Sequence, residues 1–504
     1  MVRPQARKGL PGLAALVAVQ TGVSASSLVV EIVAGRMLAP YIGMSLYSWT
    51  AIIAVVLAGF SAGHWAGGAI ADRPPRRALA LTAWSLVAAA LATAGCIFLL
   101  RWLAPAILPA IDSTLAGITV LTAAIFFMPS FFAGIPAPVL ARIAVEGSRE
   151  REGRALGAVF AAGAVGAIAG TLLAGFVFIS WIGSIGTLSM VAAVYLALAL
   201  VCAACAGRIL PGLAAALPAA VLAGAGLLQP ASCTRESAYF CIRVIDAEAE
   251  AGEPARLMVL DHLGHGMSAR HSPRRMLTPH AALLDALTRS RVGGRQFSAF
   301  LIGGGSYSLP RAWSTLEPPP RLTVAEIDPA VTQTAVADFW FDPEVATVHH
   351  GDARRILLDT RDRFDVVIGD AFTDITIPAH LVTREFFELV AARLQPDGAY
   401  LMNVVDHPAR LQALAAIAAT MRTVFPVVEI WVERASLRSG GRTVFILLGS
   451  REASATAAVL GAPPDRLEAE RMPAELVDGL IASRKPPVLT DDYAPIDRLT
   501  GISG

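Results

Sequence analysis

The first 230 or so residues consist of long apolar segments separated by short polar ones. Segments long enough to cross the ~30 Å hydrocarbon layer of a bilayer lie at about residues 10–33, 48–71, 79–100, 115–140, 156–181 and 186–206. A weaker seventh segment, about residues 209–229, contains Pro211 and Pro218. No signal-peptide cleavage pattern follows the first segment, so we expect a retained helix there. The pattern predicts an α-helical polytopic membrane domain of six to seven helices over residues 1–231.

From Ser232 onward the apolar runs are short, as in a soluble protein. Alternating runs at residues 239–245 and 256–260 predict a small β element, which we place at residues 232–296. A larger domain over residues 297–504 then alternates strand-like and helical segments. Its strand-like runs are residues 297–303, 321–327, 345–349, 364–370, 398–405, 427–433 and 442–449.

The order of these segments predicts the fold of the larger domain. The last two runs are joined by Ser439, Gly440 and Gly441, which is a hairpin signal. Five strands with helical connections and a final hairpin are expected of a class I S-adenosylmethionine-dependent transferase fold, a Rossmann-like variant of the doubly wound α/β sheet. In such sheets the ligand binds at the carboxyl ends of the strands. The residues at these ends are Gly303, Gly304, Gly305, Glu326, Asp328, Gly351, Asp352, Gly369, Asp370 and residues 403–406.

The glycine triplet at residues 303–305 is the first sign of a nucleotide site. Glycines let the backbone approach a ligand closely. Glu326 follows about 20 residues later, where a carboxylate can bind both hydroxyls of a ribose. Because glycine clusters are also common turn signals, the triplet alone does not distinguish a nucleotide site from an ordinary turn. The acidic or glycine residues at four of the five strand ends favour the nucleotide interpretation.

These residues carry a resemblance to a known family. Residues 235–498 resemble the spermidine synthases, which are polyamine aminopropyltransferases, and the whole chain resembles the subgroup in which this domain follows a membrane domain. The segments that carry the resemblance are residues 256–261, 301–305, 324–329, 351–353, 364–370, 381–387 and 394–398.

The resemblance implies transfer of an aminopropyl group from decarboxylated S-adenosylmethionine, a co-substrate, to a polyamine acceptor such as putrescine. The products would be spermidine and methylthioadenosine, and no metal is implied. By that resemblance Glu326 holds the ribose hydroxyls, Asp352 takes the adenine amino group, and Asp370 is catalytic beside the sulfonium and the acceptor amine. The remaining donor-site candidates are Gly303, Gly304, Gly305, Ser306, Asp328 and Ala353, and the candidate acceptor-binding residues are Asp374, His265 and His380.

An acidic residue at position 370 fits this chemistry. An ammonium group cannot attack, but a carboxylate that accepts its proton and orients the free amine lets nitrogen displace methylthioadenosine from the carbon next to sulfur. Simple structural roles stay open for the neighbouring residues: Asp352 as a helix N-cap, Asp374 as a turn cap and His380 as a loop residue.

Three departures from the family pattern surround the donor tail and the acceptor. Ser306 stands where the family usually has an acidic residue, and His265 stands where a Gln is common. The segment from Asp370 to Asp374 is one residue longer than the usual Asp-Ser-Ser-Asp. Recognition of the nucleoside therefore looks retained, whereas the donor tail and the acceptor stay open. The alternatives are another S-adenosylmethionine-dependent alkyl or methyl transfer, and a transporter or sensor that only binds a nucleoside or a polyamine.

Charge and cysteine content narrow the possible partners. The net charge of +1 argues against a nucleic-acid partner, which needs clustered Lys and Arg. We expect a small-molecule amine substrate, contact with the lipid bilayer and a possible homodimer through the soluble domain. Cys233 and Cys241 could form disulfides only in an oxidising compartment, and we expect both to be reduced.

Basic residues lie in alternate connections of the predicted bundle: Arg3, Arg7 and Lys8; Arg73, Arg76 and Arg77; Arg149, Arg151 and Arg154; and Arg208. Cytoplasmic loops are enriched in Lys and Arg, so the N-terminus is placed in the cytoplasm. Seven crossings would then put the transferase domain outside, away from intracellular nucleotides, whereas six would not. We therefore expect that residues 209–229 do not cross fully, or that another crossing is miscounted. The expected protein is multi-pass in the cell membrane, with a cytoplasmic catalytic domain.

Overall fold

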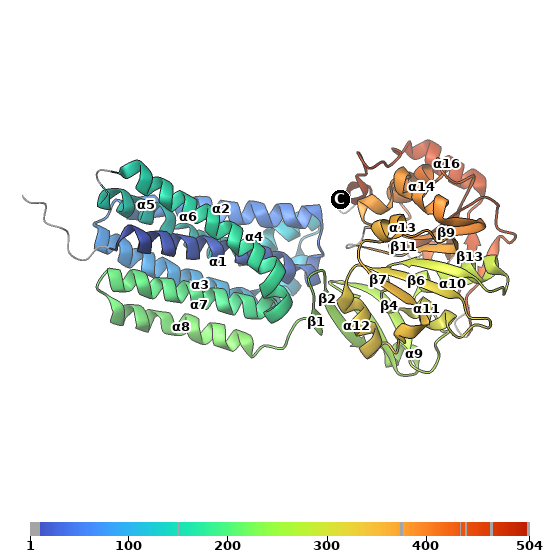
Figure 1. Cartoon of the computed structure of the whole chain (residues 1–504), viewed down its shortest axis with the longest axis horizontal. Helices are drawn as coiled ribbons and strands as arrows, with labels where there is room; N and C mark the ends of the chain where they lie inside the picture. Colours follow the sequence, from blue (N-terminus) through green and yellow to red (C-terminus); the bar gives the residue numbers. More distant parts are fainter. Residues whose placement is uncertain are drawn as a thin grey trace, which may run out of the picture. The chain divides into compact units, whose positions relative to one another are not determined.

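The computed structural model describes residues 11–148, 151–372, 376–433, 435–438, 441–463 and 467–500. The chain divides into two compact units, Met1–Ala238 and Tyr239–Gly504. The first unit is built from long helices, and the second from sheets covered by helices (Figure 1).

The first unit is a bundle of apolar helices. Their bounds are α1 Leu13–Ile42, α2 Leu46–Ala71, α3 Pro75–Ile107, α4 Thr114–Gly134, α5 Pro136–Gly147, α6 Glu152–Leu173, α7 Ile179–Cys205 and α8 Ile209–Leu227. The π-helical turn Ala174–Phe178 joins α6 to α7, and α7 is kinked at Gly183. Six stretches of the described residues are long and apolar enough to cross a membrane, and the longest of them, Glu152–Cys205, contains both α6 and α7.

Pairs of residues in contact give the direction of the helices. Where residue numbers rise together the helices are parallel, and where one rises as the other falls they are antiparallel. By this criterion α6 is parallel to α1, α7 is antiparallel to α1, and α8 is antiparallel to α7. The pairs are, in this order, Gln20 with Gly163 and Ala25 with Gly170; Gly22 with Leu198 and Ser27 with Tyr195; and Ala203 with Gly212 and Ser189 with Ala223.

The remaining helices complete an alternating bundle. The short connection from Gly43 to Ser45 reverses the chain between α1 and α2. Helix α4 is parallel to α2, and α3 is parallel to α8. The pairs are Gly59 with Ser130 and Gly67 with Ile135, then Ile97 with Gly226 and Arg101 with Gln229. Helices α1, α3, α6 and α8 therefore run one way and α2, α4 and α7 the other, so α8 ends at the opposite end of the bundle from the start of α1 (Figure 1).

The length of helix α8 bears on the expectation that residues 209–229 do not fully cross the membrane. Its 19 residues rise by about 28 Å at 1.5 Å each, close to the ~30 Å of the hydrocarbon layer. Pro218 lies inside the helix and does not end it. The expected shortfall is therefore not supported by the length of this helix.

The second unit begins with a small antiparallel sheet. Strands β2 (Cys241–Asp246), β3 (Ala255–Leu260) and β4 (Leu263–Ala269) pair in sequence order. The short helix α9 (Glu248–Ala251) lies between β2 and β3, and helix α10 (Pro279–Val292) follows β4. The predicted boundary between residues 296 and 297 falls between α10 and the next strand.

Among the described residues, nine strands form the larger sheet in the order β12-β13-β10-β11-β9-β8-β5-β6-β7. Strands β5 to β9 pair in parallel, and the strands from β10 to β13 pair antiparallel. The bounds are β5 Ser298–Ile302, β6 Arg321–Glu326, β7 Thr347–His350, β8 Phe364–Gly369, β9 Leu394–Asp406, β10 Val427–Glu433, β11 Thr443–Ser450, β12 Ala458–Leu460 and β13 Glu468–Arg471. The chain winds outward from β5 in both directions, so β5 and β8 flank the topological switch point.

Helices cover both faces of this sheet. Successive residues of a strand point to opposite faces, so neighbouring residues of one strand belong to different cores. Leu301 of β5 belongs to a core with α10, α11 (Ser308–Trp313) and α12 (Pro329–Asp338). Its neighbour Phe300 belongs to a second core with α13 (Ala353–Asp359), α14 (Arg384–Arg393), α15 (Gln412–Met421) and α16 (Ala474–Arg484). The central strands are thus buried on both faces, and their ends are left to build a site.

Candidate active site

Backbone hydrogen bonds align the carboxyl ends of the parallel strands. Three residues that lie just past a strand each donate their amide N–H to a backbone carbonyl oxygen at the end of a neighbouring strand. The bonds run from Gly303 to the Ala325 oxygen (2.9 Å), from Asp370 to the Ile302 oxygen (3.0 Å) and from Gly351 to the Glu326 oxygen (3.0 Å). The sequence-predicted residues at these four ends therefore lie along one edge of the sheet.

Glycine is required at two positions of the triplet. Gly303 and Gly305 have φ angles of +92° and +50°, which favour glycine. A Cβ on Gly303 would collide with the carbonyl oxygen of Asp370, and one on Gly305 with the carbonyl oxygen of His265. The turn is therefore held between the end of β8 and strand β4, with its backbone close to both.

Glu326 closes the other side of this turn. Its carboxylate accepts hydrogen bonds from the N–H groups of Gly304 (2.8 Å) and Asp328 (2.9 Å). The side chain is buried, and this burial raises the pKa of Glu326 to about 7. A carboxylate in this position can accept further hydrogen bonds from ligand hydroxyls.

Asp328 and Ser306 have structural contacts of their own. Asp328 is the N-cap of α12 and accepts a hydrogen bond from the N–H of Ala330 (2.9 Å). Ser306 is buried, and its hydroxyl lies 3.4 Å from the hydroxyl of Ser268 on β4. Ser306 is thus a neutral residue packed between the glycine turn and the small sheet.

Asp370 lies at the end of β8 among polar side chains from three other elements. Its Oδ1 accepts a hydrogen bond from the Asn403 Nδ2 on β9 (2.8 Å), and its Oδ2 lies 3.9 Å from the His280 Nε2 at the start of α10. His265 on β4 interacts electrostatically with the same carboxylate. Loss of solvent lowers the pKa of His265 to about 4, so its imidazole is neutral at pH 7.

Asp352 lies at the start of α13, after β7. Its Oδ1 accepts the N–H of Arg355 (3.0 Å), which makes it the N-cap, and its Oδ2 lies 2.7 Å from the His380 Nε2. Arg354 forms a bidentate ion pair with Asp491 (2.7 Å for both contacts) and donates to the His380 carbonyl. The N-cap role uses only Oδ1. A ligand role is compatible with it, because Oδ2, which contacts His380, can accept a further hydrogen bond.

The structure brings together some predicted residues and separates others. His265 lies near the carboxylate of Asp370, whereas His380, predicted to bind the acceptor, contacts Asp352. Ala353 is buried in the first turn of α13. Asp374 lies outside the described residues. His280 was not predicted from the sequence, because it follows Pro279 at a helix start and belongs to no recognisable motif.

Part of the second unit matches a known protein family. Residues 299–450 match the spermine/spermidine synthase domain. The chain is 30% identical over 217 residues to a polyamine aminopropyltransferase of Vibrio vulnificus, covering 40% of this chain and 68% of the relative. It is 31% identical over 119 residues to a probable polyamine aminopropyl transferase of Bifidobacterium longum, covering 24% of this chain and 26% of that relative. Among solved structures, a probable spermidine synthase from Corynebacterium glutamicum matches 51% of this chain and 96% of its own, with 20% identity and a TM-score of 0.45.

Proposed function

The chain belongs to the polyamine aminopropyltransferase family, and from this premise we propose that it transfers the aminopropyl group of decarboxylated S-adenosylmethionine to a polyamine acceptor such as putrescine. The observation that carries the proposal is the position of Asp370. Its backbone carbonyl packs against Gly303 of the glycine turn, at the edge where β5 and β6 also end, and Asn403 donates to one oxygen of its carboxylate. The other oxygen faces His280 and is left for an amine.

In the proposed reaction Asp370 accepts a proton from the acceptor ammonium. The free nitrogen then forms a bond to the methylene carbon next to the sulfonium, and the carbon–sulfur bond breaks with its electron pair passing to sulfur. The products are a secondary ammonium and neutral methylthioadenosine. Holding amine and donor in line lowers the entropic part of the barrier, and the carboxylate supplies general-base catalysis.

The charges around Asp370 suit two cationic substrates. Because the pKa of His265 is lowered to about 4, this imidazole adds no positive charge at pH 7. A protonated histidine would repel both the sulfonium and the amine. We therefore propose that His265 contributes shape and a neutral hydrogen-bonding group to the acceptor side.

The donor nucleoside fits the remaining groups of this edge. We propose that Glu326 binds the ribose hydroxyls, that the glycine turn gives the donor room to approach the backbone, and that Asp352, held by His380, binds the adenine amino group. Ser306 offers a hydroxyl instead of a carboxylate to the donor tail. The amino group of that tail thus lacks an anionic partner at residue 306.

We propose further that residues 1–231 are a multi-pass membrane domain in contact with lipid, that residues 232–296 and 297–504 divide the remaining chain, and that the soluble domain forms a homodimer. Neither nucleic acid nor metal has a part in the proposed reaction. With a cytoplasmic N-terminus, the cytoplasmic placement predicted for the catalytic domain requires an even number of membrane crossings. The alternating helix directions described above correspond to an odd number.

Product analysis tests the proposed reaction. The detergent-solubilised full chain is incubated with putrescine and either decarboxylated or intact S-adenosylmethionine, and products are identified by mass spectrometry. We expect spermidine and methylthioadenosine from the decarboxylated donor. Release of S-adenosylhomocysteine from the intact donor, without methylthioadenosine from the other, would instead identify a methyltransferase.

A further inference from the structure

The charges at the two ends of the helical bundle are unequal. The end at which α1 begins also holds the connections α2–α3, α5–α6 and α7–α8. The arginines at this end, among the described residues, are Arg73, Arg76, Arg77, Arg142, Arg151, Arg154 and Arg208. Those of the opposite end are Arg36, Arg101 and Arg235. The excess of arginine identifies the first end as the cytoplasmic one.

The segment after α8 is fastened to the arginine-poor end. Arg101 at the end of α3 donates to the side chain of Gln229 (3.2 Å) and to the carbonyl of Pro230, and Arg36 of α1 donates to the carbonyl of Ser237 (3.1 Å). The Glu236 carboxylate accepts the N–H of Ser184 in α7 (2.9 Å). Arg36 and Arg101 of this end thus bind the protein's own chain.

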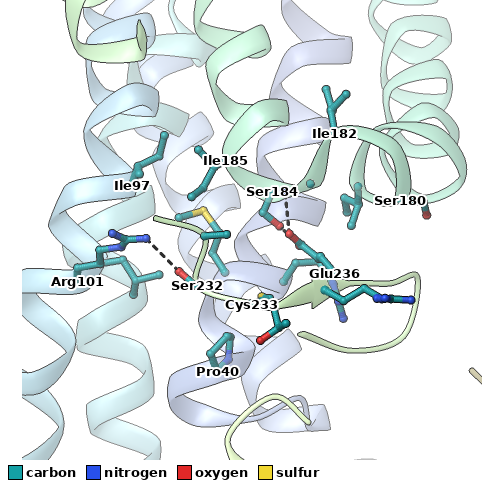
Figure 2. A pocket seen from close by; sticks show the side chains of 18 of the residues that line it. Pro40, Ile97, Arg101, Ser180, Ile182, Ser184, Ile185, Ser232, Cys233 and Glu236 are labelled. Atoms are coloured by element: carbon teal, nitrogen blue, oxygen red, sulfur yellow. Dashed lines mark hydrogen bonds between the residues drawn. The ribbon is translucent and has the colours of Figure 1, made fainter. Parts of the chain in front are cut away.

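These contacts surround a cavity of about 310 Å³ at that end of the bundle. Figure 2 shows Ser232 and Glu236 reaching into it from the segment after α8, toward Arg101 and Ser184 respectively. Bonds to three different helices hold residues 229–237 at this end. The chain therefore does not turn back through the bundle before the second unit begins.

The cysteines give an independent indication of compartment. Cys233 and Cys241 are both disulfide-bonded, whereas Cys96, Cys202 and Cys205 in the bundle are free. This corrects our expectation that Cys233 and Cys241 are reduced. Disulfides persist in oxidising compartments and are rare in the cytosol. The two oxidised cysteines lie just after α8, the last helix of the bundle, where the chain enters the second unit.

From these observations we infer that the chain crosses the membrane seven times and that its transferase unit lies on the non-cytoplasmic side. The odd number of crossings, the arginine excess at the first end and the two oxidised cysteines agree on this placement. It replaces the cytoplasmic placement expected from the sequence. That expectation assumed that a nucleotide-binding domain must share a compartment with intracellular nucleotides.

The placement has a chemical consequence that rests on the proposed function. A sulfonium nucleoside and a polyamine are both cations, and cations do not cross a hydrocarbon layer unaided. The transferase therefore uses donor and acceptor that a transport step has delivered to the outer side, and it releases the elongated amine and methylthioadenosine there.

Cysteine labelling in intact cells tests the placement. Ser483→Cys adds an exposed thiol to the second unit, and Gly153→Cys adds one to the arginine-rich end of the bundle. Cells that express either full-length variant are treated with a membrane-impermeant maleimide, before or after permeabilisation, and the unsubstituted chain is the background. We expect Ser483→Cys to react in intact cells and Gly153→Cys only after permeabilisation.

The reverse pattern would overturn the inference, as would equal protection of both sites in intact cells. A second readout is the number of thiols that react in denatured protein taken directly from cells. We expect this number to rise by two on reduction, and no rise would count against the oxidising compartment. Neither readout depends on catalysis, so a different reaction at the site would leave both results unchanged.

Discussion

Asn403 and Asp370 are joined by a hydrogen bond of 2.8 Å between neighbouring parallel strands, with the amide Nδ2 donating to the carboxylate Oδ1. The bond fixes one oxygen of the carboxylate and leaves the second facing His280. A general base whose position is set by a strand loses little entropy when it meets the substrate amine. Asn403 is therefore a positioning residue for the proposed catalytic carboxylate.

Replacement of Asn403 tests this role. A hydrogen bond to a charged group contributes about 1.5–3 kcal/mol, so we expect Asn403→Ala to lower kcat by about 10- to 100-fold. Donor binding should change little, because the nucleoside contacts other strand ends. Steady-state kinetics and donor calorimetry separate the two effects. A variant that loses donor affinity and kcat together would indicate a general loss of structure.

The sequence predicted the central strands and the acidic strand ends for a clear physical reason. The central strands β5 and β8 are buried on both faces, which makes them nearly continuous apolar runs, and parallel strands end at a common edge. Strands β12 and β13 are short strands at one side of the sheet without such runs, and they were missed. The contacts of Asp370 with Asn403 and His280 depend on how β9 and α10 pack, which local sequence does not encode. The oxidised state of Cys233 and Cys241 was missed because the compartment was assumed from the fold.

The raised pKa of Glu326 predicts a pH dependence of donor binding. With a pKa of about 7 in the unliganded protein, the carboxyl is protonated below that pH and ionised above it. Ribose hydroxyls bind the ionised form best, so linkage predicts that the donor Kd rises by about tenfold between pH 8 and pH 6. Calorimetry at the two pH values measures it. The exposed control Glu344→Gln should keep this dependence and Glu326→Gln should lose it; an unchanged dependence in Glu326→Gln would contradict the assignment.

Two substitutions at His265 separate its shape from its charge. Because the pKa of His265 is lowered to about 4, the native side chain is neutral throughout the physiological range. His265→Gln keeps a neutral polar group and should retain kcat and the amine KM within a few fold. His265→Arg introduces a cation near Asp370, and a like charge costing about 1.4 kcal/mol would raise the amine KM about tenfold. Equal KM values in the two variants would mean that the amine does not approach this residue.

The same pKa shift gives a stability prediction. The folded chain holds His265 neutral down to about pH 4, whereas the unfolded chain protonates this residue below its ordinary value of 6.5. Protonation of the unfolded state lowers the free energy of unfolding progressively as the pH falls from 6.5 toward 4. Thermal unfolding of His265→Gln should depend less on pH over this window than that of the wild type. An identical dependence would place His265 in contact with solvent.

Asp352 allows the helix cap and the nucleoside contact to be told apart. Asn is as good an N-cap as Asp, whereas Ala costs about 1 kcal/mol at such a position. Asp352→Asn should therefore keep the Tm of the wild type yet weaken donor binding, and Asp352→Ala should lower both. Calorimetric Tm and donor Kd decide between the roles. Normal donor affinity in Asp352→Asn would leave Asp352 with the cap alone.

Asp370→Asn tests the central claim most directly, through the rate of methylthioadenosine release from decarboxylated S-adenosylmethionine in the presence of putrescine. Loss of a general base costs about 100- to 10,000-fold, and we predict a loss in this range with donor affinity retained. The matched control is Asp362→Asn, an exposed residue before β8, which should match the wild type. Methylthioadenosine release by Asp370→Asn at the wild-type rate would contradict the account.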